Sequence, residues 1–220
     1  MSTLIKALRP FASCDIGDAL VKLKYPLGGY LNGISIWSPV RQGHGVAPTV
    51  IGAAVTVKMV DAKDSSAPTP SKHFADSAEP GKIMYIQQPN GMQAACFGGL
   101  MGTRLKQIGA AGVIIDGRFR DIREMQDLGL PMFARSSSIL GSNSFTKASQ
   151  LNVPLQFSGD LWIHPGDILV GDEDGVVVVP PSLVEQVAQL CHERKEIDGR
   201  TLQDLLDGAE MGPTIKKHRK

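Results

Sequence analysis

The sequence has no long hydrophobic run. Within its 220 residues, no apolar segment reaches the roughly 18 residues that a membrane-spanning helix needs. The first residues, MSTLIKALRPF, are too short and too interrupted by polar side chains to form a signal peptide. We therefore expect a soluble, cytoplasmic protein with no membrane partner.

Charge of one sign and cysteine are also scarce. The 23 basic and 22 acidic residues leave a net charge of +1, so no nucleic-acid partner is expected. The three cysteines, Cys14, Cys96 and Cys191, form no CxxC pair, which argues against a disulfide framework or a zinc site. Each is predicted to be a small buried side chain. The one basic cluster, 216–220, is predicted to be a frayed, solvated end rather than a phosphate-binding arm.

Glycine and proline, by contrast, are plentiful, with 24 and 14 residues spread along the chain. They separate many short elements. Residues 83–86 and 111–116 are predicted to be apolar strands, and the helix between them ends at Gly109. The Asp-Gly pair that closes the second strand is predicted to form a turn. A strand–helix–strand unit of this kind fits parallel pairing.

Further along the chain the pattern continues to mix helices and strands. We expect a helix over 121–128, an antiparallel hairpin over 166–179, and helices near 183–197 and 200–208. The predicted fold class is α/β, as one domain over 1–220. We expect a mixed sandwich whose sheet layers are covered by helices on one side.

The start of the helix that ends at Gly109 is a candidate anion site. Gly98 and Gly99 precede it, and glycine lets a ligand approach the main chain closely. The N–H groups of Leu100 and Met101 would have no acceptor within the helix and would lie at its positive end. The spacing fits neither GxxxxGK[ST] nor GxGxxG. Taken alone, it favours a tight turn, with a bound carboxylate or phosphate as the functional alternative.

Arg120, Asp121 and Glu124 follow the second strand, where ligands gather in open α/β sheets. Asp121 and Glu124 are three residues apart, so a helix places both carboxylates on one face. Two carboxylates suit Mg²⁺ or Mn²⁺, and Arg120 can grip a carboxylate or keto oxygen with two hydrogen bonds. Taken alone, these residues favour an acidic first helical turn with solvated arginines. Together with Gly98 and Gly99 at the helix start, however, they describe a site for a 2-keto acid such as pyruvate.

Several segments in order resemble the RraA-like family. They are GGLM, GAAGVIIDGRFRD, IGAAVTV, AEPGKIMYI, LGLPMFAR and HPGDILVGDEDGVVVVP, and they cover most of the chain. This family includes class II 4-hydroxy-4-methyl-2-oxoglutarate/4-carboxy-4-hydroxy-2-oxoadipate aldolases and the inhibitor of ribonuclease E. The resemblance implies the family's swivelling β/β/α-type fold. GGLM and the tail IKKHRK look most like fungal-type members.

The resemblance also implies roles for individual residues. Asp121 would hold the metal and Arg120 would contact the pyruvyl oxygens, so both count as catalytic. Gly98 and Gly99 would open the helix whose amides, at Leu100 and Met101, bind the pyruvate carboxylate. The implied activity is a lyase that depends on Mg²⁺ or Mn²⁺ and releases pyruvate through its enolate. Its substrates would be 4-hydroxy-4-methyl-2-oxoglutarate, oxaloacetate, or both.

One position departs from the family pattern. Bacterial aldolases carry an Asp or Glu where this chain has Gly99, and that carboxylate helps to position a water. A subset of the family instead resembles G-x(20)-R-D-x(2)-[DE], which Gly99, Arg120, Asp121 and Glu124 fit. In that subset Glu124 would share the metal or its waters. Oxaloacetate decarboxylation is then expected to be at least as robust as aldol cleavage.

The resemblance further implies a homotrimer or homohexamer. Helices from about residue 183 would contact a neighbouring subunit, whose site an acidic residue would complete. Glu193 and Glu196 both lie on the right element, and the sequence does not choose between them. The alternative function is a non-catalytic, protein-binding regulator of the ribonuclease-inhibitor type. The two hypotheses differ in whether Asp121 and Glu124 both reach a metal.

Overall fold

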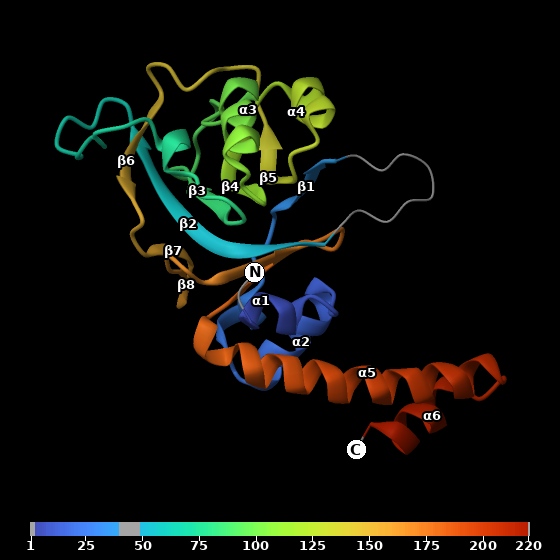
Figure 1. The fold of residues 1–220 in the computed structure, drawn as a ribbon. Helices are drawn as coiled ribbons and strands as arrows, with labels where there is room; N and C mark the ends of the chain where they lie inside the picture. Colours follow the sequence, from blue (N-terminus) through green and yellow to red (C-terminus); the bar gives the residue numbers. More distant parts are fainter. Residues whose placement is uncertain (1–2, 40–48, 220) are drawn as a thin grey trace.

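The fold is built around one curled, eight-stranded sheet (Figure 1). The computed structural model describes residues 3–39 and 49–219. The strand order is β1-β5-β4-β3-β2-β9-β10, and β6 pairs with a second stretch of β2. The strands of this sheet are β1 (Ser35–Ser38), β2 (Val50–Asp61), β3 (Ile83–Gln87), β4 (Gly112–Phe119), β5 (Met132–Ser137), β6 (Thr146–Leu151), β9 (Ile168–Gly171) and β10 (Val176–Val179). A separate hairpin joins β7 (Leu155–Ser158) to β8 (Leu161–Ile163).

Strand β2 connects the two halves of the sheet. It pairs with β3 in parallel along 54–58. Its other edge pairs antiparallel with β9 along 50–53 and with β6 along 57–61. Most of its 12 residues are buried, because it passes between two packed layers.

The parallel half of the sheet, β3-β4-β5, carries α3 (Gly99–Ile108) and α4 (Ile122–Leu128) on its outer face. Alternate residues of each strand face these helices. Gly109 ends α3 in a left-handed conformation, with φ of 85°. The buried cluster on this face includes Met84, Ile86, Val113, Ile115, Phe119, Met132, Leu105 and Met125.

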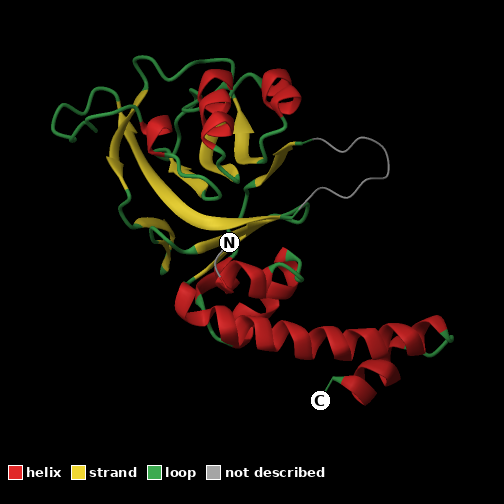
Figure 2. Ribbon diagram, in the orientation of Figure 1, coloured by secondary structure: helices red, strands yellow, loops and turns green. Residues whose placement is uncertain are grey.

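The other half, β9-β10, is covered by α1 (Thr3–Leu8), α2 (Ser13–Lys22) and α5 (Val184–Leu206). A third buried cluster fills the space between the halves and includes Tyr85, Ile114, Phe133, Leu169, Val176 and Val178. Each layer therefore has helices on its outer side and the other layer on its inner side (Figure 2). This arrangement confirms the mixed α/β sandwich that the sequence predicts.

Strand β4 is longer than expected. It continues through Asp116 and Gly117 to Phe119, so the prediction of a turn at this Asp-Gly pair is wrong. Pairing with β5 becomes irregular between Ile115 and Arg118. This irregularity accommodates Asp116 and Gly117 within the strand, so the strand does not end there. The longer strand leads directly into Arg120 and Asp121.

The C-terminal part also differs from the prediction. One helix of 23 residues, α5, replaces the two expected helices, and it extends past the body of the protein (Figure 1). Gly199 lies inside it, at a cost of about 1 kcal/mol relative to alanine. The turns around it are supported by Arg194 and Asp198, whose Nε and Oδ2 are 3.0 Å apart. None of the described helices is both long enough and apolar enough to cross a membrane.

Helix α6 (Met211–His218) folds back against α5. Lys217 Nζ and His218 Nε2 each lie 2.7 Å from Asp204 Oδ2, and Arg219 Nη2 lies 2.6 Å from Asp198 Oδ1. The predicted frayed end is therefore wrong for residues 216–219, because acidic side chains of α5 pair with the basic cluster. Lys220 lies outside the described residues.

Candidate active site

A pocket of about 150 Å³ lies where β4 ends and α3 begins. The carboxyl ends of parallel strands are the usual position of ligands in such sheets. The structure brings the glycines at 98 and 99 together with Arg120 and Asp121 here, although the two pairs are more than twenty residues apart in sequence. The pocket is lined by residues 95–101, by Arg120 and Asp121, and by Gly141, Ser142 and Asn143.

The start of α3 presents free amides to this pocket. Gly102 N–H closes the first helical turn on the Gly98 carbonyl at 3.0 Å. Gly99 N–H donates to Asp121 Oδ2 at 2.9 Å. The N–H groups of Leu100 and Met101 precede the first intrahelical donor, so the helix itself offers them no acceptor. They form the positive end at which the family resemblance places a pyruvate carboxylate.

Gly98 allows the two ends of the site to approach. A Cβ at this position would lie 2.6 Å from Asp121 Oδ2 and 3.2 Å from Arg120 Cγ. Both distances are shorter than ordinary van der Waals contacts, and Asp121 is held by the start of α4. Any side chain at position 98 would therefore separate the acidic residue from the helix start.

Arg120 is fixed through its backbone while its side chain stays accessible. Its N–H donates to the Phe97 carbonyl at 3.0 Å, which extends the strand pairing beyond β4. Its Nε lies 3.5 Å from Asp121 Oδ2, and 48% of its side chain is exposed. On its other side, a Cβ at Gly141 would lie 2.9 Å from Nη1. The guanidinium thus lies between Asp121 and the 141–143 loop, facing the pocket.

Asp121 has an unusual backbone conformation. Its φ of 65° and ψ of 47° are left-handed, at the residue that precedes α4. Outside glycine this conformation costs on the order of 1–3 kcal/mol and is typical of functional positions. It turns the carboxylate back toward α3, where Oδ2 meets Gly99 N–H and Arg120 Nε.

Glu124 stands against the same glycine. A Cβ built at Gly99 would overlap Glu124 Oε2 and lie 3.2 Å from Cδ. The carboxylates of Asp121, which precedes α4, and of Glu124, in its first turn, thus both lie against the start of α3. The sequence does not reveal that Glu124 occupies the space that a side chain at position 99 would fill.

These donors fit a hard divalent cation. Asp121, which lines the pocket, and Glu124, which lies against Gly99, could offer carboxylate oxygens, and Mg²⁺ commonly takes one or two carboxylates and keeps several waters. Among residues 3–39 and 49–219, no group of three or more His, Cys, Asp or Glu side chains could hold a metal. A cation here would therefore complete its coordination with water and substrate oxygens.

Cys96 lies in the pocket wall but is fully buried. Burial raises the pKa of its thiol to about 12, so it stays protonated at neutral pH. The prediction that each cysteine is buried holds for Cys96 and Cys191 but is wrong for Cys14, which is exposed.

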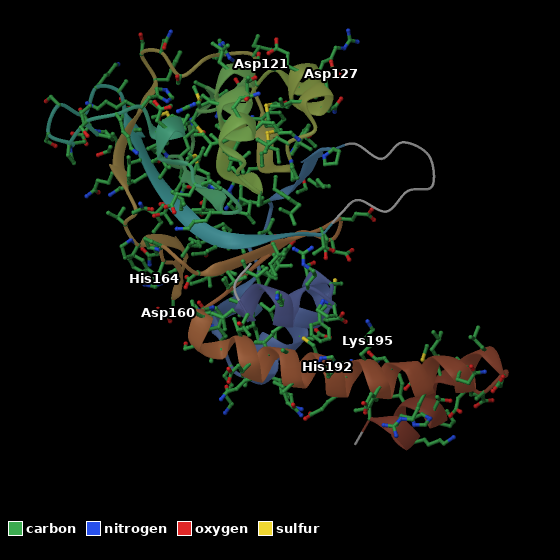
Figure 3. All side chains as sticks on the ribbon, viewed as in Figure 1. Asp121, Asp127, Asp160, His164, His192 and Lys195 are labelled. Atoms are coloured by element: carbon green, nitrogen blue, oxygen red, sulfur yellow. The ribbon has the colours of Figure 1, made fainter. Side chains whose placement is uncertain are left out.

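Glu193 and Glu196 lie on α5, far from this pocket. Figure 3 shows their neighbours His192 and Lys195 on the lower helix and Asp121 at the opposite end of the protein. Neither glutamate can therefore complete the site of its own chain.

The sequence did not predict the third wall of the pocket, which residues 141–143 form. Gly141, Ser142 and Asn143 belong to a polar loop without a recognisable motif, and the loop is held by Ala95 N–H donating to the Leu140 carbonyl at 2.8 Å. A contact between segments so far apart in the chain leaves no local signal.

Comparisons with known proteins show the family of this chain. The RraA-like family profile, described as Aldolase/RraA, matches residues 13–178. A Halalkalibacterium halodurans protein named "Putative 4-hydroxy-4-methyl-2-oxoglutarate aldolase" is 32% identical over 194 residues, covering 88% of this chain and 84% of its own. An Albidiferax ferrireducens protein of the same name is 32% identical over 177 residues, covering 79% of this chain and 98% of its own.

Solved structures show the same fold. An uncharacterised Pseudomonas syringae protein superposes with a TM-score of 0.84 at 23% identity, covering 98% of this chain and 93% of its own. Streptomyces coelicolor RraAS2, an unusual member of the RNase ES inhibitor RraA protein family, has a TM-score of 0.74 at 22% identity, covering 95% and 98%. The fold, the matched residues and the relatives agree, and the chain belongs to the RraA-like family.

Proposed function

We propose that this protein is a divalent-metal-dependent lyase that cleaves short 2-keto acids and releases pyruvate. The observation that carries the proposal is the arrangement of Arg120, Asp121 and the first amides of α3 around one small pocket, with the Glu124 carboxylate against Gly99 of its lining. The names of the relatives support an aldolase. Oxaloacetate decarboxylation uses the same intermediate and makes fewer demands on the site.

Two positive groups, the start of α3 and the guanidinium of Arg120, would bind the substrate. The carboxylate of the keto acid would accept from Leu100 and Met101 N–H at the start of α3. The 2-oxo group would then face Arg120, whose guanidinium N–H groups can donate to its oxygen. The pocket volume of about 150 Å³ admits a small keto acid.

Asp121 and Glu124 are the residues that would hold Mg²⁺ or Mn²⁺. Such a cation supplies a Lewis acid that polarises the 2-oxo group. The hydrogen bond from Gly99 N–H to Oδ2 holds the Asp121 carboxylate beside the pocket. Glu124 is placed by contact with the same glycine.

The reaction breaks the bond between C3 and C4 of the substrate. Its electron pair moves into the C2–C3 bond, and negative charge develops on the 2-oxo oxygen beside Arg120. The guanidinium of Arg120, already in place at the pocket, would stabilise this charge in the transition state. Carbon dioxide leaves from oxaloacetate, whereas a second keto acid leaves from the aldol substrate. Protonation of C3 from water then gives pyruvate.

The two substrates differ in their need for a base. Aldol cleavage must remove a hydroxyl proton, whereas decarboxylation removes none. Cys96 stays protonated, with a pKa of about 12. Asp121 already accepts from Gly99 and contacts Arg120. Glu124 is then the candidate base, and using it as such competes with its metal role. We therefore expect oxaloacetate to be cleaved at least as well as 4-hydroxy-4-methyl-2-oxoglutarate.

The regulator hypothesis also fits the family, and Glu124 favours the enzyme. A protein-binding module gives no reason for two carboxylates to be directed at one helix start. Here Asp121 adopts a costly backbone conformation that turns its carboxylate there.

We further propose a trimer or hexamer in which α5 of one copy contributes Glu193 or Glu196 to the site of another.

A coupled assay of pyruvate release tests the proposal. Purified protein is given oxaloacetate or 4-hydroxy-4-methyl-2-oxoglutarate, and lactate dehydrogenase reports pyruvate by oxidising NADH. We expect release that EDTA abolishes and that added Mg²⁺ or Mn²⁺ restores. Reactions without protein correct for spontaneous and metal-catalysed decarboxylation. Pyruvate release no faster than this background, with either substrate, would remove the enzyme hypothesis.

A further inference from the structure

A second pocket, of about 140 Å³, lies at the carboxyl ends of β3, β4 and β5, on the face directed away from α3 and α4. Arg118 and Asp116 alternate along β4 with the residues that face those helices. The pocket is lined by residues 88–93 and 116–118, and by Arg135 and Ser136. None of these residues belongs to the proposed lyase site.

Arg118 has only neutral partners in this pocket. Its Nε donates to the Met92 carbonyl at 3.2 Å. Its Nη1 donates to Ser136 Oγ at 3.2 Å and to the Ser137 carbonyl at 3.0 Å. No carboxylate among the described residues pairs with it, and residues 1–2, 40–48 and 220 contain no aspartate or glutamate. No acidic side chain therefore balances this half-buried positive charge.

The nearby carboxylate of Asp116 does not neutralise Arg118, because it is already paired. Asp116 is 6% exposed and accepts from Arg135 Nε and from the Tyr85 hydroxyl, the latter at 3.1 Å. Burial, together with Asp116, raises the pKa of Tyr85 well above its ordinary value, so Tyr85 remains a neutral donor. Asp116 and Arg135 cancel each other, and one positive charge remains in the pocket.

The donors left over suit an oxyanion. A guanidinium has five N–H groups, and the three recorded hydrogen bonds of Arg118 use its Nε and Nη1. Both N–H groups of Nη2 remain for a ligand. The Ser136 hydroxyl accepts from Arg118, so its own hydrogen is free to donate. The volume corresponds to about four or five water molecules, which is too small for a nucleotide.

We propose that this pocket binds a small oxyanion, either inorganic phosphate or a short dicarboxylate, through Arg118 and Ser136. The site is physically linked to the lyase pocket. Gln88 Oε1 accepts from Arg118 N–H at 3.0 Å, and the Arg118 carbonyl accepts from Cys96 N–H at 2.9 Å. The segment 88–97 thus lines one pocket with its first half and the other with its second. The proposal does not depend on the lyase activity.

Calorimetric titration with phosphate and with malonate tests it. Arg120→Met serves as the background, because it weakens anion binding at the lyase pocket. In that background we expect Arg118→Met to weaken binding of the preferred anion by about 10- to 100-fold, the loss expected for charge-assisted hydrogen bonds. The matched control is Arg123→Met, which removes an exposed arginine of α4 and should leave the affinity unchanged.

The remaining outcomes are also decisive. Tighter binding of phosphate identifies a phosphate site, and tighter binding of malonate identifies a dicarboxylate site. Equal affinity in the Arg118→Met and Arg123→Met proteins, or no binding of either anion in the background protein, would overturn the proposal. If Arg118→Met does not fold, Ser136→Ala should weaken the same anion severalfold and Arg118→Lys should retain part of the affinity.

Discussion

Glu124 occupies the space that a side chain at Gly99 would need. A Cβ at position 99 would overlap Glu124 Oε2, and the two residues come from different helices, α4 and α3. A carboxylate is thus present at the start of α3, although the residue there is glycine. The departure from the family pattern at position 99 is matched by an acidic residue that reaches the same place from the next helix.

Gly99→Ala is expected to lower pyruvate release by about tenfold or more while the protein stays folded. The added methyl group must push the Glu124 carboxylate away, since helix α3 cannot move without disturbing its packing on Met125. Steady-state pyruvate release and the Mg²⁺ dependence of the rate are measured together. A rate equal to that of the unmodified protein would show that the position of Glu124 is unimportant.

The control is a double-mutant cycle with Glu124→Ala. Once the glutamate side chain is removed, a methyl group at position 99 has nothing to displace, so its effect should largely disappear. Coupling between contacting residues of this kind is typically 0.5–3 kcal/mol. Strictly additive losses would place the effect of Gly99→Ala in the backbone of α3 instead.

Asp121→Asn is expected to abolish metal-dependent pyruvate release and leave the fold intact. Asparagine tolerates the left-handed conformation of residue 121, and its amide oxygen can still accept from Gly99 N–H. Only the charge needed to hold a divalent cation is lost. Far-UV circular dichroism checks the fold, and Mg²⁺ titration of the activity checks the function. Turnover equal to that of the unmodified protein would remove Asp121 from the metal site.

Much of the fold follows from local patterns, and the exceptions have physical reasons. The β3–α3–β4 unit and the β9–β10 hairpin are apolar runs punctuated by glycine, so their sequences specify them. Strands β1, β6 and β7 were not predicted, because they are short and partly exposed and exist only through pairing with a neighbour. Helix α5 continues through Gly199 because a single glycine weakens a helix without ending it.

The candidate site likewise has some features that the sequence predicts and others that depend on tertiary contacts. Arg120, Asp121 and the glycines were found from their motif, since they are adjacent in sequence or start an element. The loop at 141–143 and the placement of Glu124 over Gly99 depend on tertiary contacts. The left-handed backbone of Asp121 is likewise imposed by the junction of β4 and α4. No spacing in the sequence reveals any of these three features.

Thiol reactivity should separate the three cysteines. Cys14 is exposed, whereas burial raises the pKa of both Cys96 and Cys191 to about 12. With Ellman's reagent near pH 8, we expect one thiol to react in the folded protein and three after denaturation. Partial burial and Asp174 also raise the pKa of Cys14, so its rate should increase steeply as pH rises toward 9. Fast reaction of two thiols in the folded protein would contradict the burial of one of them.

Docking of α6 on α5 should be sensitive to acid. Hydrogen bonds from Lys217 and then His218 lower the pKa of Asp204. Partial burial raises the pKa of Asp198, but hydrogen bonds from Arg219 and Arg194 outweigh it and lower the pKa overall. A carboxylate whose pKa is lower in the folded state stabilises that state above its unfolded pKa, and this contribution is lost as pH falls through the folded value. The α6 contact should therefore hold at neutral pH and weaken below about pH 4.

Hydrogen–deuterium exchange of the peptide covering 211–219 measures this contact directly. Asp204→Asn removes the charge at neutral pH and should raise exchange in that peptide, as acid does in the unmodified protein after correction for intrinsic rates. Asp207→Asn is the matched control, because Asp207 accepts from Gln203 Nε2 at 3.1 Å on the same helix and contacts none of the basic residues of α6 that the structure describes. Equal protection of the peptide in all three proteins would mean that apolar packing, rather than the Asp204 cluster, holds α6 in place.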